Sequence, residues 1–166
     1  MKNTSKKLYV AYGSNLDLGQ MKHRCPDATV YGSGKIQNYE LTFWGNWRRN
    51  GVATIVPHQK FFVPVGVFKI SATDEENLDI YEGWPHLYRK ENIQVKMDDG
   101  ETVTAMIYLM NKNGMVESSP SPGYFHTISI GYSDFGFDLD VLEFAAEKVA
   151  RHTDKYYNYR YGFSKI

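Results

Sequence analysis

The chain has 166 residues, of which 42% are hydrophobic and 15% aromatic, and its 19 basic and 19 acidic residues leave no net formal charge. This length predicts a single domain over residues 1–166 with one sizeable core. Zero net charge argues against strong attraction to nucleic acid or to an anionic membrane. Cys25 is the only cysteine, which excludes an internal disulfide and a cysteine cluster for a metal and favours a reducing, cytoplasmic setting. No apolar run of about 18 residues occurs, so we expect no membrane span.

The first half of the chain alternates between strand and turn patterns. Residues 8–12 are apolar and rich in β-formers, which predicts a buried strand that breaks at Gly13-Ser14-Asn15. A short helix is expected over residues 17–23, with Asp17 near its start. Further strands are predicted over residues 29–34, 39–43, 52–56 and 62–70, and Pro57 is expected to end the third of them.

The second half combines helices with one hairpin. Thr73, followed three residues later by Glu76, predicts a capping box that starts a helix ending near Gly83. The pair Asp99-Gly100 predicts a hairpin turn between strands 88–97 and 102–110. Residues 139–152 predict a helix with one apolar face, whereas residues 125–132 fit a helix or a strand equally well.

Gly13-Ser14-Asn15 is the first candidate site. A buried strand that ends in Gly-Ser can present its next backbone N–H groups as a concave anion site. A helix that begins just afterwards adds a favourable dipole, and a carboxylate ligand would suit such a site. An ordinary strand-to-helix turn has the same local pattern, and the pattern by itself favours that interpretation.

Glu82 is the second candidate. It precedes Gly83 at the end of a predicted helix, between Tyr81 and Trp84. Aromatic neighbours can desolvate a carboxyl group and raise its pKa toward neutrality, where it can accept and return a proton. Most glutamates are solvated surface residues, so Glu82 considered alone does not predict catalysis.

Other chemistry-bearing residues form weaker patterns. Ser14 has no companion histidine and aspartate at recognisable positions, although such triads are spatial. Arg48-Arg49 beside Trp44 and Trp47 can stack on nucleic-acid bases, but zero net charge favours a surface loop. The histidines show no metal-ligand spacing, so we expect no metal site; they are His23, His58, His86, His126 and His152.

Several segments, in this order, resemble the γ-glutamylcyclotransferase family, in its bacterial form. Residues 8–16, with Tyr12-Gly13-Ser14-Asn15 at their centre, resemble the family's substrate loop. Residues 78–85 resemble the segment that carries its catalytic glutamate, and Tyr88-Arg89 follows as in bacterial relatives. Pro120-Ser121-Pro122-Gly123-Tyr124 resembles a later segment that supplies a substrate-contacting tyrosine. The resemblance covers roughly residues 8–132.

The resemblance implies an α+β fold: a mixed, mainly antiparallel β-barrel flanked by helices, with a cavity at one mouth. It also implies a cofactor-free enzyme that converts a γ-glutamyl amide, of an amino acid or an amine, to 5-oxoproline and a free amine. Glu82 takes the position of the family's proton acceptor. The implied substrate contacts are Tyr9, Val10, Ala11, Tyr12, Gly13, Ser14, Asn15, Tyr88 and Tyr124.

This chemistry needs proton transfer and one anion site. The substrate's own α-amine attacks its side-chain carbonyl, so proximity is built into the substrate. Glu82 would remove the amine's proton and return one to the departing amine, while N–H groups near Gly13 and Ser14 hold the carboxylate or the oxyanion.

The expected partner is a small γ-glutamyl molecule, with no nucleic acid and no membrane. The aromatic residues 156–163 leave a homodimer open. The alternatives are a non-catalytic module that binds a small acid or amine and a nucleic-acid or protein adaptor that uses Trp44, Trp47 and Arg48-Arg49.

Overall fold

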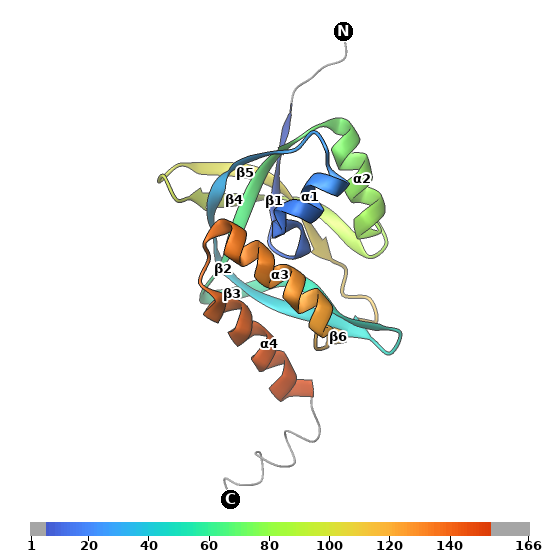
Figure 1. Cartoon of the computed structure of the whole chain (residues 1–166). Coiled ribbons are helices and arrows are strands. Elements are labelled where there is room, and N and C mark those ends of the chain that lie inside the picture. Colours follow the sequence, from blue (N-terminus) through green and yellow to red (C-terminus); the bar gives the residue numbers. More distant parts are fainter. Residues whose placement is uncertain (1–5, 154–166) are drawn as a thin grey trace, which may run out of the picture.

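A closed β-barrel forms the centre of the computed structural model, which describes residues 6–153 (Figure 1). The barrel order is β3-β1-β5-β4-β2, and it closes because β3 also pairs with β2. The β1–β5 pair is parallel, whereas the β1–β3, β2–β3, β2–β4 and β4–β5 pairs are antiparallel. This confirms the predicted mixed, mainly antiparallel barrel. The strands are β1 (Lys7–Ala11), β2 (Thr29–Asn46), β3 (Arg49–Ile70), β4 (Tyr88–Met97) and β5 (Thr102–Met110).

The β2–β3 hairpin is much longer than the sequence indicates. The four strands predicted between residues 29 and 70 are parts of two continuous strands of 18 and 22 residues. Pro57 does not end a strand: it pairs with Tyr39, beside a register shift between Gln37 and Tyr39 at which Asn38 takes a φ of 62°. Proline is tolerated at such irregular positions because no regular ladder bond is required of it there. The irregularities let both strands curve around the barrel.

Helix α2 (Ala72–Glu82) ends at a residue that matters for the site. Its N-cap is Ser71, whose hydroxyl accepts from the Asp74 N–H while the Asp74 carboxylate accepts from the Ser71 N–H. The predicted box at Thr73 and Glu76 is therefore displaced by two residues. Gly83 adopts the left-handed conformation, with φ 65°, and stops the helix as predicted. Glu82 is thereby fixed as the last residue of α2.

The remaining helices pack outside the barrel. Figure 1 shows α1 (Leu18–Arg24) beside α2, while α3 (Pro122–Phe135) and α4 (Leu139–Thr153) lie together across the barrel. α3 settles the ambiguity over residues 125–132, and α4 matches its predicted span within one residue. A short strand, β6 (Val116–Glu117), extends the sheet beside β2 and was not predicted. The aromatic segment 156–163 lies outside the described residues.

Helix α3 supports the turn that follows β1. Residues Ser14–Leu16 form a single 3-10 turn, η1, and α3 crosses it closely at Gly131. A Cβ atom at position 131 would lie 2.4 Å from the Leu16 Cβ, so only glycine permits this approach. None of the helices within residues 6–153 is long and apolar enough to cross a membrane.

Candidate active site

The Gly13-Ser14-Asn15 loop presents backbone donors while its side chains are held in place. Within residues 6–153 the N–H groups of Gly13, Ser14 and Asn15 have no hydrogen-bond acceptor. The Ser14 Oγ lies 3.0 Å from the Tyr81 hydroxyl, and the Asn15 amide donates to the Tyr9 hydroxyl over 2.9 Å. The loop is thus anchored by its side chains, and three consecutive donors stay available to an anion.

A cavity of about 170 Å³ lies beside this loop. It is smaller than the roughly 300–1,000 Å³ typical of pockets for drug-sized ligands, which favours a small metabolite. Nine of the predicted site residues line it: Tyr9, Val10, Tyr12, Gly13, Ser14, Asn15, Glu82, Tyr88 and Tyr124. Ala11 does not; it is buried in β1 and pairs with Gly66 of β3.

Six further residues line the cavity: Arg49, Val52, Ala53, Tyr81, Leu87 and Tyr108. The sequence carried signals for three of them. Tyr81 precedes Glu82, Arg49 belongs to the basic pair Arg48-Arg49, and Tyr108 lies in the predicted strand 102–110. Val52, Ala53 and Leu87 are apolar residues whose exposure to the cavity depends on strand register, which the sequence pattern does not supply.

The Glu82 carboxyl group borders the cavity without a partner. No hydrogen bond or ion pair to it occurs in the described part of the chain. Burial raises the pKa of Glu82 from 4.5 to about 7, although the positive charge of Arg24 acts in the opposite direction. A raised pKa of Glu82 agrees with the expectation from the sequence. Trp84, however, is 44% exposed and does not line the cavity, so desolvation comes from the cavity walls rather than from both chain neighbours.

Buried tyrosines form much of that wall. Tyr12 donates its hydroxyl hydrogen to the Tyr108 carbonyl over 2.7 Å, and Tyr88 donates to the Ala53 carbonyl over 2.8 Å. The Tyr124 hydroxyl instead accepts from the Ala53 N–H over 3.0 Å, which leaves its own hydrogen free to be donated. Burial raises the pKa of Tyr12, Tyr88 and Tyr124, so all three hydroxyls are protonated at neutral pH.

Arg24, at the end of α1, connects the loop to α2. Its guanidinium donates to the Asn15 side-chain oxygen over 2.5 Å and lies 3.4 Å from the Ser14 Oγ. The same group stacks over the Tyr81 ring at 3.7 Å from the centroid. No sequence motif marks Arg24, since these contacts join three elements only in the folded chain.

The cavity combines backbone donors, neutral hydroxyls and one carboxyl group whose pKa lies near neutrality. Such a set is typical of an enzyme that moves a proton on a small molecule and stabilises a negative charge. Among residues 6–153, no three His, Cys, Asp or Glu side chains are grouped so as to hold a metal ion. The cavity is therefore the candidate active site of the protein.

The family is shown by sequence comparison. Residues 9–126 match the sequence model of one protein family, gamma-glutamyl cyclotransferase, AIG2-like. The chain belongs to this family. Bovine gamma-glutamylcyclotransferase is 31% identical over 142 residues, which cover 80% of this chain and 73% of the relative. The human gamma-glutamylcyclotransferase is 29% identical over 143 residues, which cover 82% of this chain and 75% of the human protein.

Solved structures agree with this assignment. One named gamma-glutamyl cyclotransferase superposes with a TM-score of 0.76 at 27% identity, covering 84% of this chain and 86% of the other. An uncharacterised human protein superposes with a TM-score of 0.77 at 28% identity, and the superposition covers 85% of this chain and 86% of the human protein. The protein is accordingly an enzyme of the cyclotransferase type, as the sequence resemblance predicted.

Proposed function

We propose that the enzyme converts a γ-glutamyl amide to 5-oxoproline and a free amine, with Glu82 as the group that takes up and returns the proton. The observation that carries the proposal is the unpartnered Glu82 carboxyl group, with a pKa of about 7, in a small cavity beside the three free N–H groups of residues 13–15. The names of the relatives indicate the γ-glutamyl group.

The proposed reaction balances without a cofactor. Ionised Glu82 accepts a proton from the substrate's α-ammonium group, and the freed amine attacks the γ-carbonyl carbon, forming the new C–N bond of a five-membered ring. The C–N bond to the departing amine then breaks as Glu82 returns its proton to the departing nitrogen. The second proton on the ring nitrogen passes to the released amine, which leaves as an ammonium ion. A pKa of about 7 suits both directions of transfer near neutrality.

The loop donors support this reaction at one of two stages. Three N–H groups, of Gly13, Ser14 and Asn15, can hold the substrate's carboxylate throughout, or the oxyanion that forms when the amine attacks. The Tyr124 hydroxyl lies next to Gly13, where a Cβ atom would be 3.4 Å from it, and can donate a further hydrogen bond. Carboxylate binding that is equal throughout affects KM and leaves kcat unchanged, whereas oxyanion binding affects kcat and leaves KM unchanged.

The test is release of 5-oxoproline from a panel of γ-glutamyl amino acids and γ-glutamylamines. We expect turnover of at least one substrate, and a loss of about 10²–10⁴-fold in kcat for Glu82→Gln, which keeps the shape but cannot exchange the proton. Glu75→Gln, on the same helix and outside the cavity, is the matched control and keeps its activity. Full activity of Glu82→Gln contradicts the proton role. Saturable binding of 5-oxoproline with no turnover of any substrate favours the non-catalytic binding module.

Three further expectations accompany this function as proposals: one domain over residues 1–166, a cytoplasmic location and a homodimer. Limited proteolysis, fractionation of cells and sedimentation of the full chain test them separately.

A further inference from the structure

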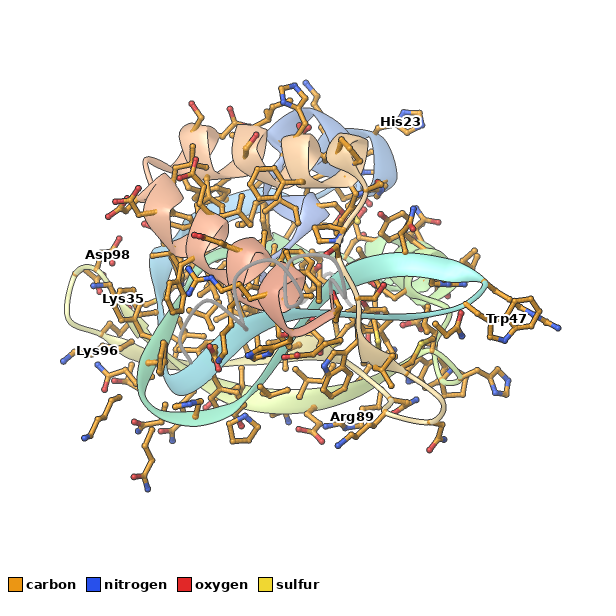
Figure 2. All side chains as sticks on the ribbon, turned by 90° about the horizontal axis from the view of Figure 1, so that it is seen from below. His23, Lys35, Trp47, Arg89, Lys96 and Asp98 are labelled. Carbon is orange, nitrogen blue, oxygen red and sulfur yellow. The ribbon has the colours of Figure 1, made fainter. Side chains whose placement is uncertain are left out.

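The tip of the β2–β3 hairpin carries two adjacent arginines with different surroundings. The chain turns at Trp47-Arg48, and Asn46 pairs with Arg49 across the turn. The Arg48 guanidinium lies over the Trp47 ring, 4.4 Å from its centroid, and Trp47 is 85% exposed. Figure 2 shows Trp47 at the outer end of the hairpin, pointing away from the barrel. Arg49, by contrast, lines the cavity.

Arg49 is a cation whose side chain has no partner among residues 6–153. It is exposed, and among the residues of the structure that are described it makes no hydrogen bond, ion pair or ring contact. Of the cavity-lining residues within 6–153, it alone carries a permanent positive charge, opposite in sign to ionised Glu82. An arginine so placed offers its planar set of N–H donors to a ligand.

The hairpin that carries Arg49 is fixed against the rest of the protein. Two residues further on, the Gly51 N–H donates to the Ser119 carbonyl over 3.0 Å. A Cβ atom at position 51 would lie 1.7 Å from the Ser118 carbonyl oxygen, so the two backbones are in direct contact there. The Ser118 N–H in turn donates to the Phe43 carbonyl over 3.0 Å. Arg49 therefore has a defined place at the edge of the cavity.

The chemistry of a γ-glutamyl amide decides which part of the substrate reaches this edge. Both reacting atoms, the α-nitrogen and the γ-carbonyl carbon, belong to the glutamyl part and must lie near Glu82. A cavity of about 170 Å³ suits that part, so the departing group on the other side of the amide extends toward the exposed rim. A departing amino acid carries a carboxylate there, whereas a departing simple amine does not.

We propose that Arg49 determines specificity by binding the carboxylate of the departing amino acid, so that the enzyme prefers γ-glutamyl amino acids to γ-glutamylamines. The inference rests on the proposed function and adds to it the choice of the released product. A guanidinium and a carboxylate match in shape through two parallel N–H···O bonds. The selectivity arises because a substrate without the carboxylate leaves Arg49 in water, as in the free enzyme.

The experiment compares γ-glutamylalanine with γ-glutamylethylamide, which differ by the carboxylate alone. We expect Arg49→Gln to lower kcat/KM for γ-glutamylalanine by about 5- to 10-fold, as for a partly exposed charged hydrogen bond, and that for γ-glutamylethylamide by less than about 2-fold. Arg49→Lys keeps the positive charge but lacks the planar pair of N–H donors, so it should lose less kcat/KM for γ-glutamylalanine than Arg49→Gln does. Arg48→Gln, one residue away and outside the cavity, is the matched control and changes neither value.

Two outcomes overturn the assignment while leaving the proposed function intact. An equal loss for both substrates in Arg49→Gln means that Arg49 serves the glutamyl part, and no loss for either means that it contacts no substrate. If the wild-type chain releases 5-oxoproline from neither compound nor from other γ-glutamyl amides, the proposed function fails and this assignment fails with it. Thermal unfolding of each variant verifies that the fold is kept.

Discussion

Helix α2 has a glutamate at each end, and the two have opposite properties. Glu75, in the first turn, is contacted by the ammonium groups of Lys7 and Lys90 at 2.9 and 3.0 Å. Burial alone would raise the pKa of Glu75, but these hydrogen bonds hold it below 4.5. Glu82, in the last turn, has no such partner, and burial raises its pKa to about 7.

The comparison shows that the partners, rather than the residue type or burial alone, decide whether the pKa of a carboxyl group is lowered or raised. The helix dipole adds to the difference, since a negative charge is favoured at the first turn and disfavoured at the last. Glu75 is committed to an ion-pair cluster with Lys90 and Asp79, whereas Glu82 keeps its lone pairs for a ligand. The predictions below test this contrast.

Among the tests of this contrast, the largest effect is expected when the Glu82 carboxyl group is moved without being removed. Glu82→Asp withdraws it by one methylene, and misplacement of about 1 Å costs about 10²-fold in rate. Glu75→Asp makes the same change at the other end of the helix and should leave kcat within about 2-fold. Steady-state assays of 5-oxoproline release measure both. Equal losses in the two variants would mean that α2 as a whole, and not the position of Glu82, governs activity.

The pH dependence of activity provides the second test. Since Glu82 must be ionised to accept the proton, kcat/KM should fall below a pKa of about 7 and be about tenfold below its plateau at pH 6. Arg24→Gln removes the charge that opposes the raised pKa of Glu82, so the fall should move to higher pH. Glu75→Gln should leave the profile where it is. An acidic limb near pH 4.5 in the wild type contradicts the role of a desolvated Glu82.

Stability should respond to pH in opposite ways at the two ends of the helix. The raised pKa of Glu82 means that the folded state holds a proton that the unfolded state loses between pH 4.5 and about 7. The free energy of unfolding therefore falls over that interval. Glu82→Gln escapes this loss, so at pH 8 it should be more stable than the wild type by roughly 1–3 kcal/mol and should match it below pH 4.5. Urea unfolding at both pH values decides; a less stable variant at pH 8 contradicts the prediction.

The smallest effect is expected at the ion-paired end. Lys90→Met removes the ammonium group that contacts both Glu75 and Asp79, and should lower the free energy of unfolding at pH 7 by about 1 kcal/mol. Because the lowered pKa of Glu75 stabilises the fold only while that carboxylate is ionised, the difference should shrink as the pH falls through that pKa. Urea unfolding at pH 7 and pH 3 measures it. A constant difference at all pH values would assign the effect to packing of the Lys90 stem.

Local signals predicted much of this fold. Asp99-Gly100 forms the turn between β4 and β5 as expected, because that dipeptide supports a tight hairpin whatever surrounds it. The end of α2 at Gly83 followed from the same kind of local preference. The segment 125–132 was left undecided by its periodicity, yet the Ser121-Pro122 start signal for α3, an N-cap and an N1 proline, lay just before it.

Long-range pairing accounts for what the sequence did not predict. Pro57 lies inside β3 because the irregularity that accommodates it is on the partner strand, next to Tyr39. The position of Ser71 as N-cap depends on Asp74, which is fully buried and also accepts a hydrogen bond from the Asp27 N–H. The contacts of Arg24 likewise join residues from α1, the loop and α2. The environments of Pro57 and Arg24 depend on neighbours distant in sequence, so no local pattern reveals them. Ser71-x-x-Asp74 is itself a local capping pattern, which competes in the sequence with Thr73-x-x-Glu76.

The contact between Gly131 and Leu16 has a consequence for synthesis of the chain. β1 and its loop leave the ribosome before the elements that they contact, because β1 lies between β3 and β5 and η1 packs against α3. After β3 has emerged, β1 must therefore wait, unpaired on one edge, until β5 and then α3 have emerged. Tyr124, which completes the cavity, belongs to that same late helix. A nascent chain therefore gains its cavity only after α3 has been made.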